Sequence, residues 1–289
     1  MQDMSPSEAR LRIIKIYKEK VHGKKPDTSK SNKDHDGKKG HWVEDMMGSK
    51  RDASNKWDLL GYEMKTGSSK TSFGDWGPNY FIFRDEKKFS NLVNKKGNER
   101  RDLQNKNKDT IFLKAFGIWR DDTEDHSYGK WPNGGYYSWS GTPSPTKASK
   151  GFNGYGQALV VNNDNSISIT YSFSKDARGN KSELVPERFQ IENLELFKWG
   201  GDWIKEKVEN KFSKFGWFKC NMKKVVYGEI MFGKPIFINN FLEWVKNGDV
   251  VFDTRMKERR PDKTDRLGMM FRASNSFWKK LAVYKYPES

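Results

Sequence analysis

One short segment organises this chain: Lys56-Trp57-Asp58-Leu59-Leu60-Gly61-Tyr62-Glu63-Met64-Lys65-Thr66. Residues two apart in a β-strand face the same side of a sheet, so Glu63 and Lys65 point together and Met64 points away. The residues Leu59-Leu60-Gly61 are typical of a bend that carries Asp58 back toward the start of this strand. Two carboxylates and one ammonium can then surround one point, which suits a hard divalent cation held by oxygen ligands. The competing interpretation is an ordinary strand that carries an ion pair.

The composition points to a polyanionic partner. The chain has 289 residues, enough for one large two-lobed domain or two smaller ones, and its aromatic content of 14% supplies a sizeable core. Lys and Arg number 54 against 38 Asp and Glu, which gives a formal net charge of +16. A basic globular chain of this kind most often binds nucleic acid. A membrane is not expected as a partner, because no apolar run approaches the length of a transmembrane helix.

Cysteine and histidine usage limits the metal chemistry. A single cysteine, Cys220, excludes an internal disulfide framework and favours a reducing compartment inside the cell. One cysteine and four histidines leave no spacing for a structural zinc site, so any metal site has to use carboxylates. The first six residues lack the apolar core of a signal peptide. We therefore expect a cytoplasmic, prokaryotic-type protein.

Apolar periodicity and turn residues predict a mixed α/β fold with a largely central sheet. Helices are expected at residues 7–21, 40–48, 86–96, 201–212 and 237–246. Strands are expected at 79–84, 110–119, 157–161, 167–173, 224–232, 249–256 and 268–272. Residues 67–78 are expected to form a loop, 98–108 a charged exposed stretch, and 120–156 a long irregular segment rich in rings.

Two stretches carry a resemblance to a known family. Gly40-His41-Trp42-Val43-Glu44-Asp45, together with the segment from Asp58 to Thr66, resembles the active-site region of PD-(D/E)xK nucleases of the MvaI/BcnI/MutH-like family. Trp57 stands where the family name has proline. The resemblance implies a restriction-endonuclease-like central sheet flanked by helices, with two lobes around a DNA cleft. Residues 1–198 would form the catalytic lobe, with an insertion at 120–156, and residues 199–289 the DNA-recognition lobe.

The same resemblance implies roles for the residues of the site. Asp58, Glu63 and the carbonyl of Met64 would ligate Mg²⁺. Mn²⁺ would substitute for it, and Ca²⁺ would support DNA binding without cleavage. Lys65 would orient or activate the attacking water and stabilise the developing negative charge, and Glu44 would support the site or a second ion. The two carboxylates would repel each other without a cation, which fits metal dependence.

A second region is a candidate for reading DNA. Residues 253–272 contain seven Lys or Arg and four Asp or Glu, a mixture that also suits a solvated hairpin tip. Arg pairs with guanine and Asp accepts from cytosine, so such a mixture suits base readout better than phosphate tracking. Residues 248–255 and 268–272 are similar to the recognition strands of the family. Residues 264–268 lack the family's histidine, so we expect a different target sequence. The implied DNA contacts are Asp253, Arg255, Lys257, Arg259, Arg260, Lys263, Asp265, Arg266 and Arg272, together with Lys70.

The resemblance implies a type II restriction endonuclease of a restriction-modification system. It would hydrolyse double-stranded DNA at a short GC-containing site, as a monomer or weak dimer, while a cognate methyltransferase protects the host site. Two nicking alternatives stay open: a MutH-like mismatch-repair endonuclease, and a strand-specific subunit of a heterodimeric restriction enzyme. A non-catalytic nucleic-acid-binding protein, in which Asp58, Glu63 and Lys65 are structural, is a third alternative.

Overall fold

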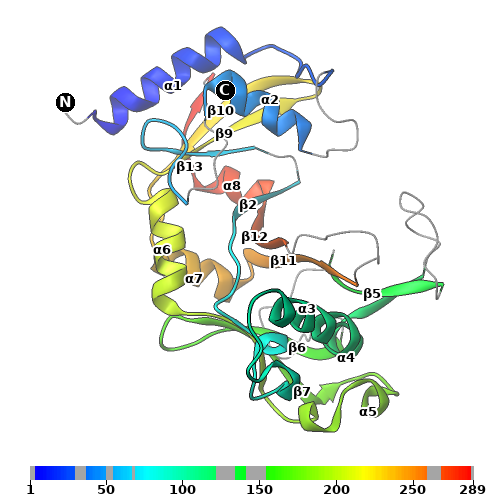
Figure 1. Ribbon diagram of the computed structural model, residues 1–289. Coiled ribbons are helices and arrows are strands. Elements are labelled where there is room, and N and C mark those ends of the chain that lie inside the picture. The colour runs from blue at the N-terminus through cyan, green and yellow to red at the C-terminus, as the bar shows by residue number, and fades with distance from the viewer. Residues whose placement is uncertain are drawn as a thin grey trace. The chain divides into compact units, whose positions relative to one another are not determined.

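The computed structural model describes residues 4–29, 37–49, 55–66, 69–121, 134–140, 154–258 and 268–287, and it confirms a mixed α/β fold (Figure 1). The chain divides into two compact units. The first contains Met1–Phe73, Lys205–Glu243 and Arg272–Ser289, and the second contains Gly74–Ile204 and Trp244–Phe271. This division differs from the single boundary expected after residue 198. Each unit combines segments that are distant in sequence, because its strands pair over long separations.

The first unit is built on a four-stranded sheet of order β1-β9-β10-β13. Its strands are β1 (Glu63–Lys65), β9 (Trp217–Lys223), β10 (Val226–Gly233) and β13 (Ala282–Tyr286). β1 is an edge strand that runs parallel to β9, and the other pairs are antiparallel. β10 confirms the strand predicted near 224–232, whereas β9 and β13 were not predicted.

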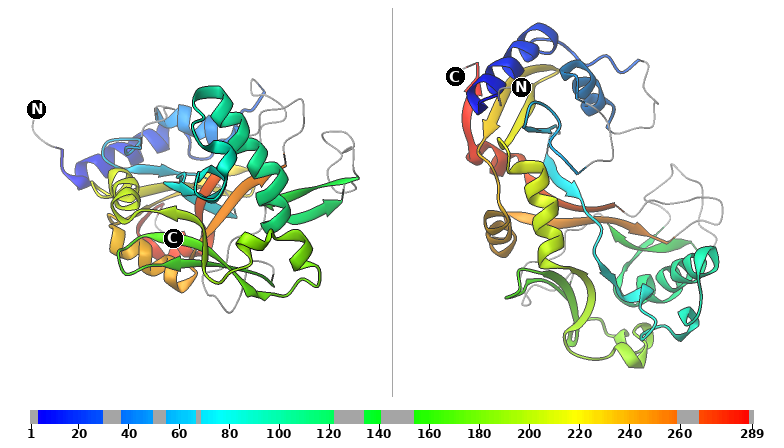
Figure 2. Two further views of the ribbon diagram at one scale, coloured as in Figure 1. Left: turned by 60° about the horizontal axis from the view of Figure 1, so that its bottom comes forward. Right: turned by 60° about the vertical axis from the view of Figure 1, so that its left-hand side comes forward.

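Two N-terminal helices pack on this sheet, as the two views of Figure 2 show. α1 (Pro6–Lys20) begins with a capping box between Ser5 and Glu8 and has proline in its first turn, which satisfies otherwise free backbone N–H groups. α2 (Lys38–Met47) ends at Gly48, whose φ of 76° is the left-handed conformation that favours glycine. Both helices were predicted. Their apolar faces share one core with residues from β1, β9 and β10, including Tyr17, Val43, Met47, Tyr62, Met64, Phe218 and Phe232.

Three further helices follow later in the chain: α6 (Gly201–Phe212), α7 (Ile238–Asn247) and α8 (Asn275–Leu281). α6 and α7 match their predicted ranges, because their apolar residues recur at helical spacing. α8 was not predicted.

The second unit holds a sheet of order β3-β8-β7-β6, made of β3 (Tyr80–Phe81), β8 (Leu194–Trp199), β7 (Ile167–Asp176) and β6 (Tyr155–Val161). A five-stranded sheet has the order β2-β12-β11-β5-β4. Its strands are β2 (Lys70–Asp75), β12 (Gly268–Ser274), β11 (Val250–Lys257), β5 (Gly135–Ser140) and β4 (Ile118–Asp121). β2 and β12 contribute residues to both units. The β6–β7 hairpin, β11 and β12 confirm their predicted strands.

Several local predictions between residues 67 and 140 were wrong. The loop at 67–78 contains β2, and the segment 120–156 contains β5. Residues 86–96, predicted as a helix, form turns with a short 3₁₀ turn at Ser90–Leu92. Residues 98–108, predicted as an exposed stretch, lie almost entirely in helix α3 (Gly97–Asn107). The strand predicted at 79–84 is shorter in the structure. It consists of β3 (Tyr80–Phe81), which is followed by a 3₁₀ turn at Ile82–Arg84.

The strand predicted at 110–119 was also wrong. This part of the chain is a π-helical turn (Lys108–Phe112), helix α4 (Leu113–Phe116) and then β4. Phe112, Leu113 and Phe116 are all buried. A short apolar run that is buried on most sides does not distinguish a strand from a helix by periodicity. α5 (Lys181–Leu184) was not predicted either. Within the described part of the chain, no helix is long and apolar enough to cross a membrane.

Candidate active site

The edge strand β1 places the predicted pair on one face. The Nζ atom of Lys65 lies 2.8 Å from Oε1 of Glu63, and both side chains are buried. The Glu63 N–H donates to the Gly216 carbonyl at the start of β9, so the backbone groups of Met64 face the opposite, open edge. The same-face arrangement predicted for Glu63 and Lys65 is confirmed.

The bend before β1 brings Asp58 to that open edge. Leu60 and Gly61 both have positive φ angles, 48° and 88°, and Tyr62 donates back to the Leu59 carbonyl. A Cβ on Gly61 would lie 2.4 Å from the Phe215 ring, so glycine is required here for space as well as for conformation. The Met64 N–H then donates to Oδ2 of Asp58 at 2.8 Å. The predicted return of Asp58 to the strand is therefore present.

Lys211, on α6, is a site residue that was missed in the sequence. Its Nζ lies 2.9 Å from the same Glu63 oxygen that accepts from Lys65. Lys65 in turn donates to the Phe73 carbonyl and lies 5.0 Å from the ring centroid of Phe212. The signal in the sequence was the position of Lys211. It is three residues after the buried Val208, at the edge of the apolar stripe of a helix with three lysines, of which Lys205 is exposed.

A third lysine lies beside Lys65 on the neighbouring strand. Lys219 is the β9 residue in register with Lys65, and it is fully buried. Its Nζ donates to Oγ1 of Thr71 at 2.8 Å. Burial lowers the pKa of Lys219 to about 8, and the nearby charge of Lys65 acts in the same direction. The site thus contains three lysines, Lys65, Lys211 and Lys219, and two carboxylates.

The two carboxylates differ in protonation. Burial acts to raise the pKa of Glu63, but the ammonium groups of Lys65 and Lys211 outweigh it and hold that pKa below its ordinary value. Burial, together with the charge of Glu63, raises the pKa of Asp58 to about 7. Burial also lowers the pKa of Lys65, against the attraction of Glu63. Glu63 is thus ionised, while Asp58 is poised to gain or lose a proton near neutral pH.

The donor set fits a magnesium ion. Oε2 of Glu63 is buried and has no hydrogen-bond partner, although its sister oxygen has two. Asp58 is near enough for the Glu63 charge to raise its pKa, and the Met64 backbone faces the same edge. Mg²⁺ typically takes one or two carboxylates and keeps several waters. Among the described residues there is no group of three or more His, Cys, Asp or Glu suited to a metal, so this site would be a two-carboxylate one.

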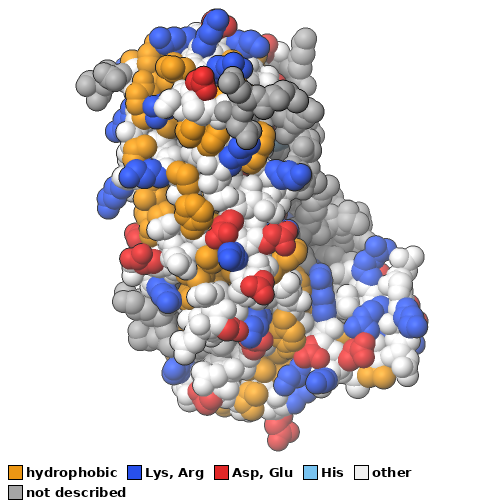
Figure 3. Space-filling model, turned by 90° about the vertical axis from the view of Figure 1, so that its left-hand side faces the viewer, with side chains coloured by type: hydrophobic (Ala, Val, Ile, Leu, Met, Phe, Trp, Pro, Cys, Tyr) orange, Lys and Arg blue, Asp and Glu red, His pale blue; other side chains and the backbone are white. Residues whose placement is uncertain are grey.

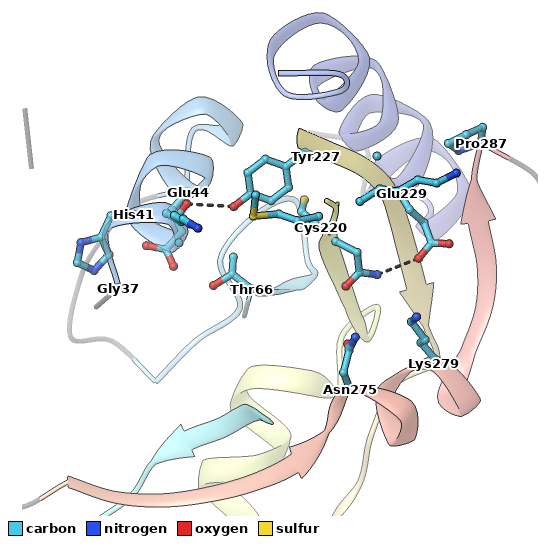
Figure 4. A pocket seen from close by; sticks show the side chains of 16 residues that line it. Gly37, His41, Glu44, Thr66, Cys220, Tyr227, Glu229, Asn275, Lys279 and Pro287 are labelled. Carbon is cyan, nitrogen blue, oxygen red and sulfur yellow. Dashed lines mark hydrogen bonds between the residues drawn. The ribbon is translucent and has the colours of Figure 1, made fainter. Parts of the chain in front are cut away.

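Glu44 lies on α2, which belongs to the same unit. It lines a pocket of about 870 Å³ with His41 of α2, Thr66 and residues of β9 and β10, such as Cys220 and Tyr227 (Figure 4). Among the described residues, Glu44 does not join Asp58 and Glu63 in a group of three ligands around one metal ion. A contribution of Glu44 to the site or to a second ion stays a prediction.

The candidate DNA contacts lie on and near the five-stranded sheet. On β11, Arg255 is exposed, Lys257 is half-buried and Asp253 is buried at 8% exposure. Arg272 is half-buried on β12, and Lys70 is exposed at the start of β2. The predicted contacts outside the described residues are Arg259, Arg260, Lys263, Asp265 and Arg266. On the face drawn in Figure 3, basic side chains are interspersed with acidic and apolar ones rather than gathered in one patch.

Comparison with known proteins gives consistent results. A model described as "LlaMI restriction endonuclease" matches residues 21–286. The type II restriction enzyme ScrFI of Lactococcus lactis subsp. cremoris is 35% identical over 296 residues, which covers 96% of this chain and 98% of that enzyme. Among solved structures, the complex of restriction endonuclease MvaI with its cognate DNA substrate matches with a TM-score of 0.54 at 13% identity, over 98% of both chains. This last likeness shows a shared fold.

Proposed function

Because the chain belongs to the LlaMI restriction endonuclease family, we propose that it is a type II restriction endonuclease that hydrolyses both strands of double-stranded DNA at a short GC-containing site. The observation that carries this proposal is the pairing of Glu63 with two lysines at one oxygen, while its other oxygen has no hydrogen-bond partner and Asp58 is near enough for the charge of Glu63 to raise its pKa. This places a carboxylate oxygen without a hydrogen-bond partner and fixed positive charge at one edge of a sheet. Metal-assisted phosphodiester hydrolysis needs both.

The cofactor would be Mg²⁺, held by Asp58, Glu63 and the Met64 carbonyl in the PD-(D/E)xK manner. When bound, the cation supplies Lewis-acid polarisation of the phosphodiester and a lower pKa for water. Lys65, fixed by Glu63 and the Phe73 carbonyl, would orient the attacking water and stabilise the negative charge that develops on the phosphate. Glu44 would support the site.

The partners follow from the same proposal. The net charge of +16 supports binding to a polyanion, and the matched MvaI structure is a complex with DNA. We propose double-stranded DNA as the substrate, a monomer or weak dimer as the active form, and a cognate methyltransferase that protects the same site in the cytoplasm.

Digestion of a plasmid of known sequence tests the activity directly. With Mg²⁺ we expect double-strand cuts, and sequencing of the ends should show one short site; with EDTA we expect none. Single-strand nicks alone would favour the mismatch-repair type of nuclease or a nicking subunit. No cleavage, together with retained DNA binding, would favour a non-catalytic binding protein.

Two variants test the residues. Lys65→Ala and Glu63→Gln should abolish cleavage, while site-specific binding in Ca²⁺ survives. Lys205→Ala, which removes an exposed lysine of α6, is the control and should cleave normally. Unchanged cleavage by either site variant would overturn the assignment of this site.

A further inference from the structure

Lys108 is a buried lysine in the second unit, outside the candidate active site. Only 2% of its surface is exposed, and it begins the π-helical turn Lys108–Phe112 that follows α3. Its Nζ lies 2.9 Å from Oδ1 of Asp109 and donates to the Lys257 carbonyl at 3.3 Å. π-helical turns are rare and frequently occur at functional sites. The Lys108 side chain thus connects this turn to the backbone of β11 at Lys257, the last residue of that strand.

The end of β11 is held from a second side by β5. The Glu258 N–H donates to the Tyr137 carbonyl at 3.0 Å, and the Tyr137 N–H donates to Oε2 of Glu258 at 3.1 Å. We call these two bonds, together with the bond from Lys108 to the Lys257 carbonyl, the β11 clamp. All of its members belong to the second unit.

The clamp acts on the register of β11. Arg255 pairs with Ser140 and Lys257 with Ser138 in the antiparallel ladder with β5. Arg255 is exposed, whereas its neighbours Thr254 and Met256 are buried. A slip of one residue along β5 would turn every β11 side chain to the opposite face. A fixed strand end therefore adds to the β5 and β12 ladders in holding the register that turns Arg255 outward.

A simple packing role does not account for a charged residue at this position. An apolar side chain of similar volume would fill the same space without the desolvation penalty of an ammonium, which amounts to several kcal/mol. The ammonium provides two interactions that an apolar side chain cannot make: an ion pair with its neighbour Asp109 and a directed hydrogen bond to one carbonyl of β11. Only the second of these reaches another strand.

We propose that Lys108 is a positioning residue for sequence recognition, which acts through the β11 clamp to hold Arg255 where it can reach a base edge. This inference rests on the proposed function, because it requires that the protein discriminates between DNA sequences. Because Lys108 is buried, it would act without contacting DNA itself.

The experiment measures how well the protein discriminates between two DNA sequences, and it does not measure cleavage. Binding in Ca²⁺ is compared for a duplex carrying the site found by plasmid digestion and for the same duplex with one base pair changed. In Lys108→Met the ratio of the two affinities should fall about fivefold or more, the loss expected when one base contact is misplaced. Binding to the changed duplex should stay near the wild-type value. Lys106→Met, which removes an exposed lysine of α3, should leave the ratio unchanged.

The outcomes separate the two proposals. A wild-type protein that binds both duplexes equally overturns the proposed function. A wild-type protein that discriminates, with a folded Lys108→Met variant that discriminates equally well or loses affinity for both duplexes alike, overturns the positioning role. If Lys108→Met does not fold, Glu258→Ala, at a half-buried side chain on the other side of the clamp, takes its place. It should show the same fall in ratio, and an unchanged ratio there overturns the inference.

Discussion

Asp58→Asn should make the metal-free protein more stable at pH 8 while it abolishes cleavage. In the folded chain, burial and the charge of Glu63 raise the pKa of Asp58 from 3.8 to about 7. At about 1.4 kcal/mol per pH unit this corresponds to roughly 4 kcal/mol. Asp58 is partly exposed, so solvent screening reduces the expected gain to about 2–4 kcal/mol. The asparagine amide keeps an oxygen that can accept from the Met64 N–H.

The raised pKa of Asp58 determines how the stability difference between variant and wild type changes with pH. The folded pKa of Asp58 lies above the unfolded one, so its protonation stabilises the fold fully below about pH 4 and this stabilisation is lost as the pH rises to about 7. The variant lacks this titration. The difference in the free energy of unfolding between variant and wild type should therefore be near zero at pH 4, grow up to about pH 7 and then stay constant.

Denaturant unfolding in EDTA from pH 4 to 8 measures this difference. Glu206→Gln, at an exposed position of α6, is the control and should show no such trend. Added Mg²⁺ should stabilise the wild type more than the Asp58→Asn variant, because binding to the folded state alone raises its stability. A variant that is no more stable than the wild type at pH 8 in EDTA would refute the account of an Asp58 carboxylate whose pKa is raised by burial and by the charge of Glu63.

Four other substitutions test the remaining structure. Arg255→Ala and Arg272→Ala should each weaken site-specific binding by about 1–3 kcal/mol in a duplex titration; an equal loss on random DNA would identify them as phosphate contacts. Lys211→Met leaves Glu63 with one ammonium and should lower stability by about 1–3 kcal/mol and slow cleavage, whereas the exposed Lys205→Met should do neither. Gly216→Ala should lower the free energy of unfolding by more than about 2 kcal/mol, since φ is 99° and a Cβ would lie 2.3 Å from a β10 carbonyl oxygen; wild-type stability in denaturant would contradict this strain.

Local geometry made much of the site predictable. The two-residue period of a strand places Glu63 and Lys65 on one face whatever the rest of the chain does. Gly61 marks the bend because it tolerates a positive φ and the close approach of Phe215. The beginning of α1 and the end of α2 were predictable for the same reason, since capping involves residues within one turn of each other.

Aromatic-rich segments were less predictable. Residues 110–119 have an apolar run that suited a strand, but Phe112 and Phe116 pack as a helix against rings contributed by distant strands, such as Trp139 and Tyr171. Burial on most sides removes the alternation that would have distinguished the two structures. The rings that stabilise the helix here are far away in the sequence.

The sequence by itself determined that two carboxylates and a lysine meet at the start of one strand, because that depends only on the strand period and a glycine bend. Only the tertiary structure decided that Lys211 of α6 shares Glu63 with Lys65, that Lys219 of β9 is in register with Lys65, and that one buried Glu63 oxygen has no hydrogen-bond partner. These features arise from pairing and packing between segments more than a hundred residues apart. The pKa values of the site arise in the same way, since burial and neighbouring charge depend on the whole fold.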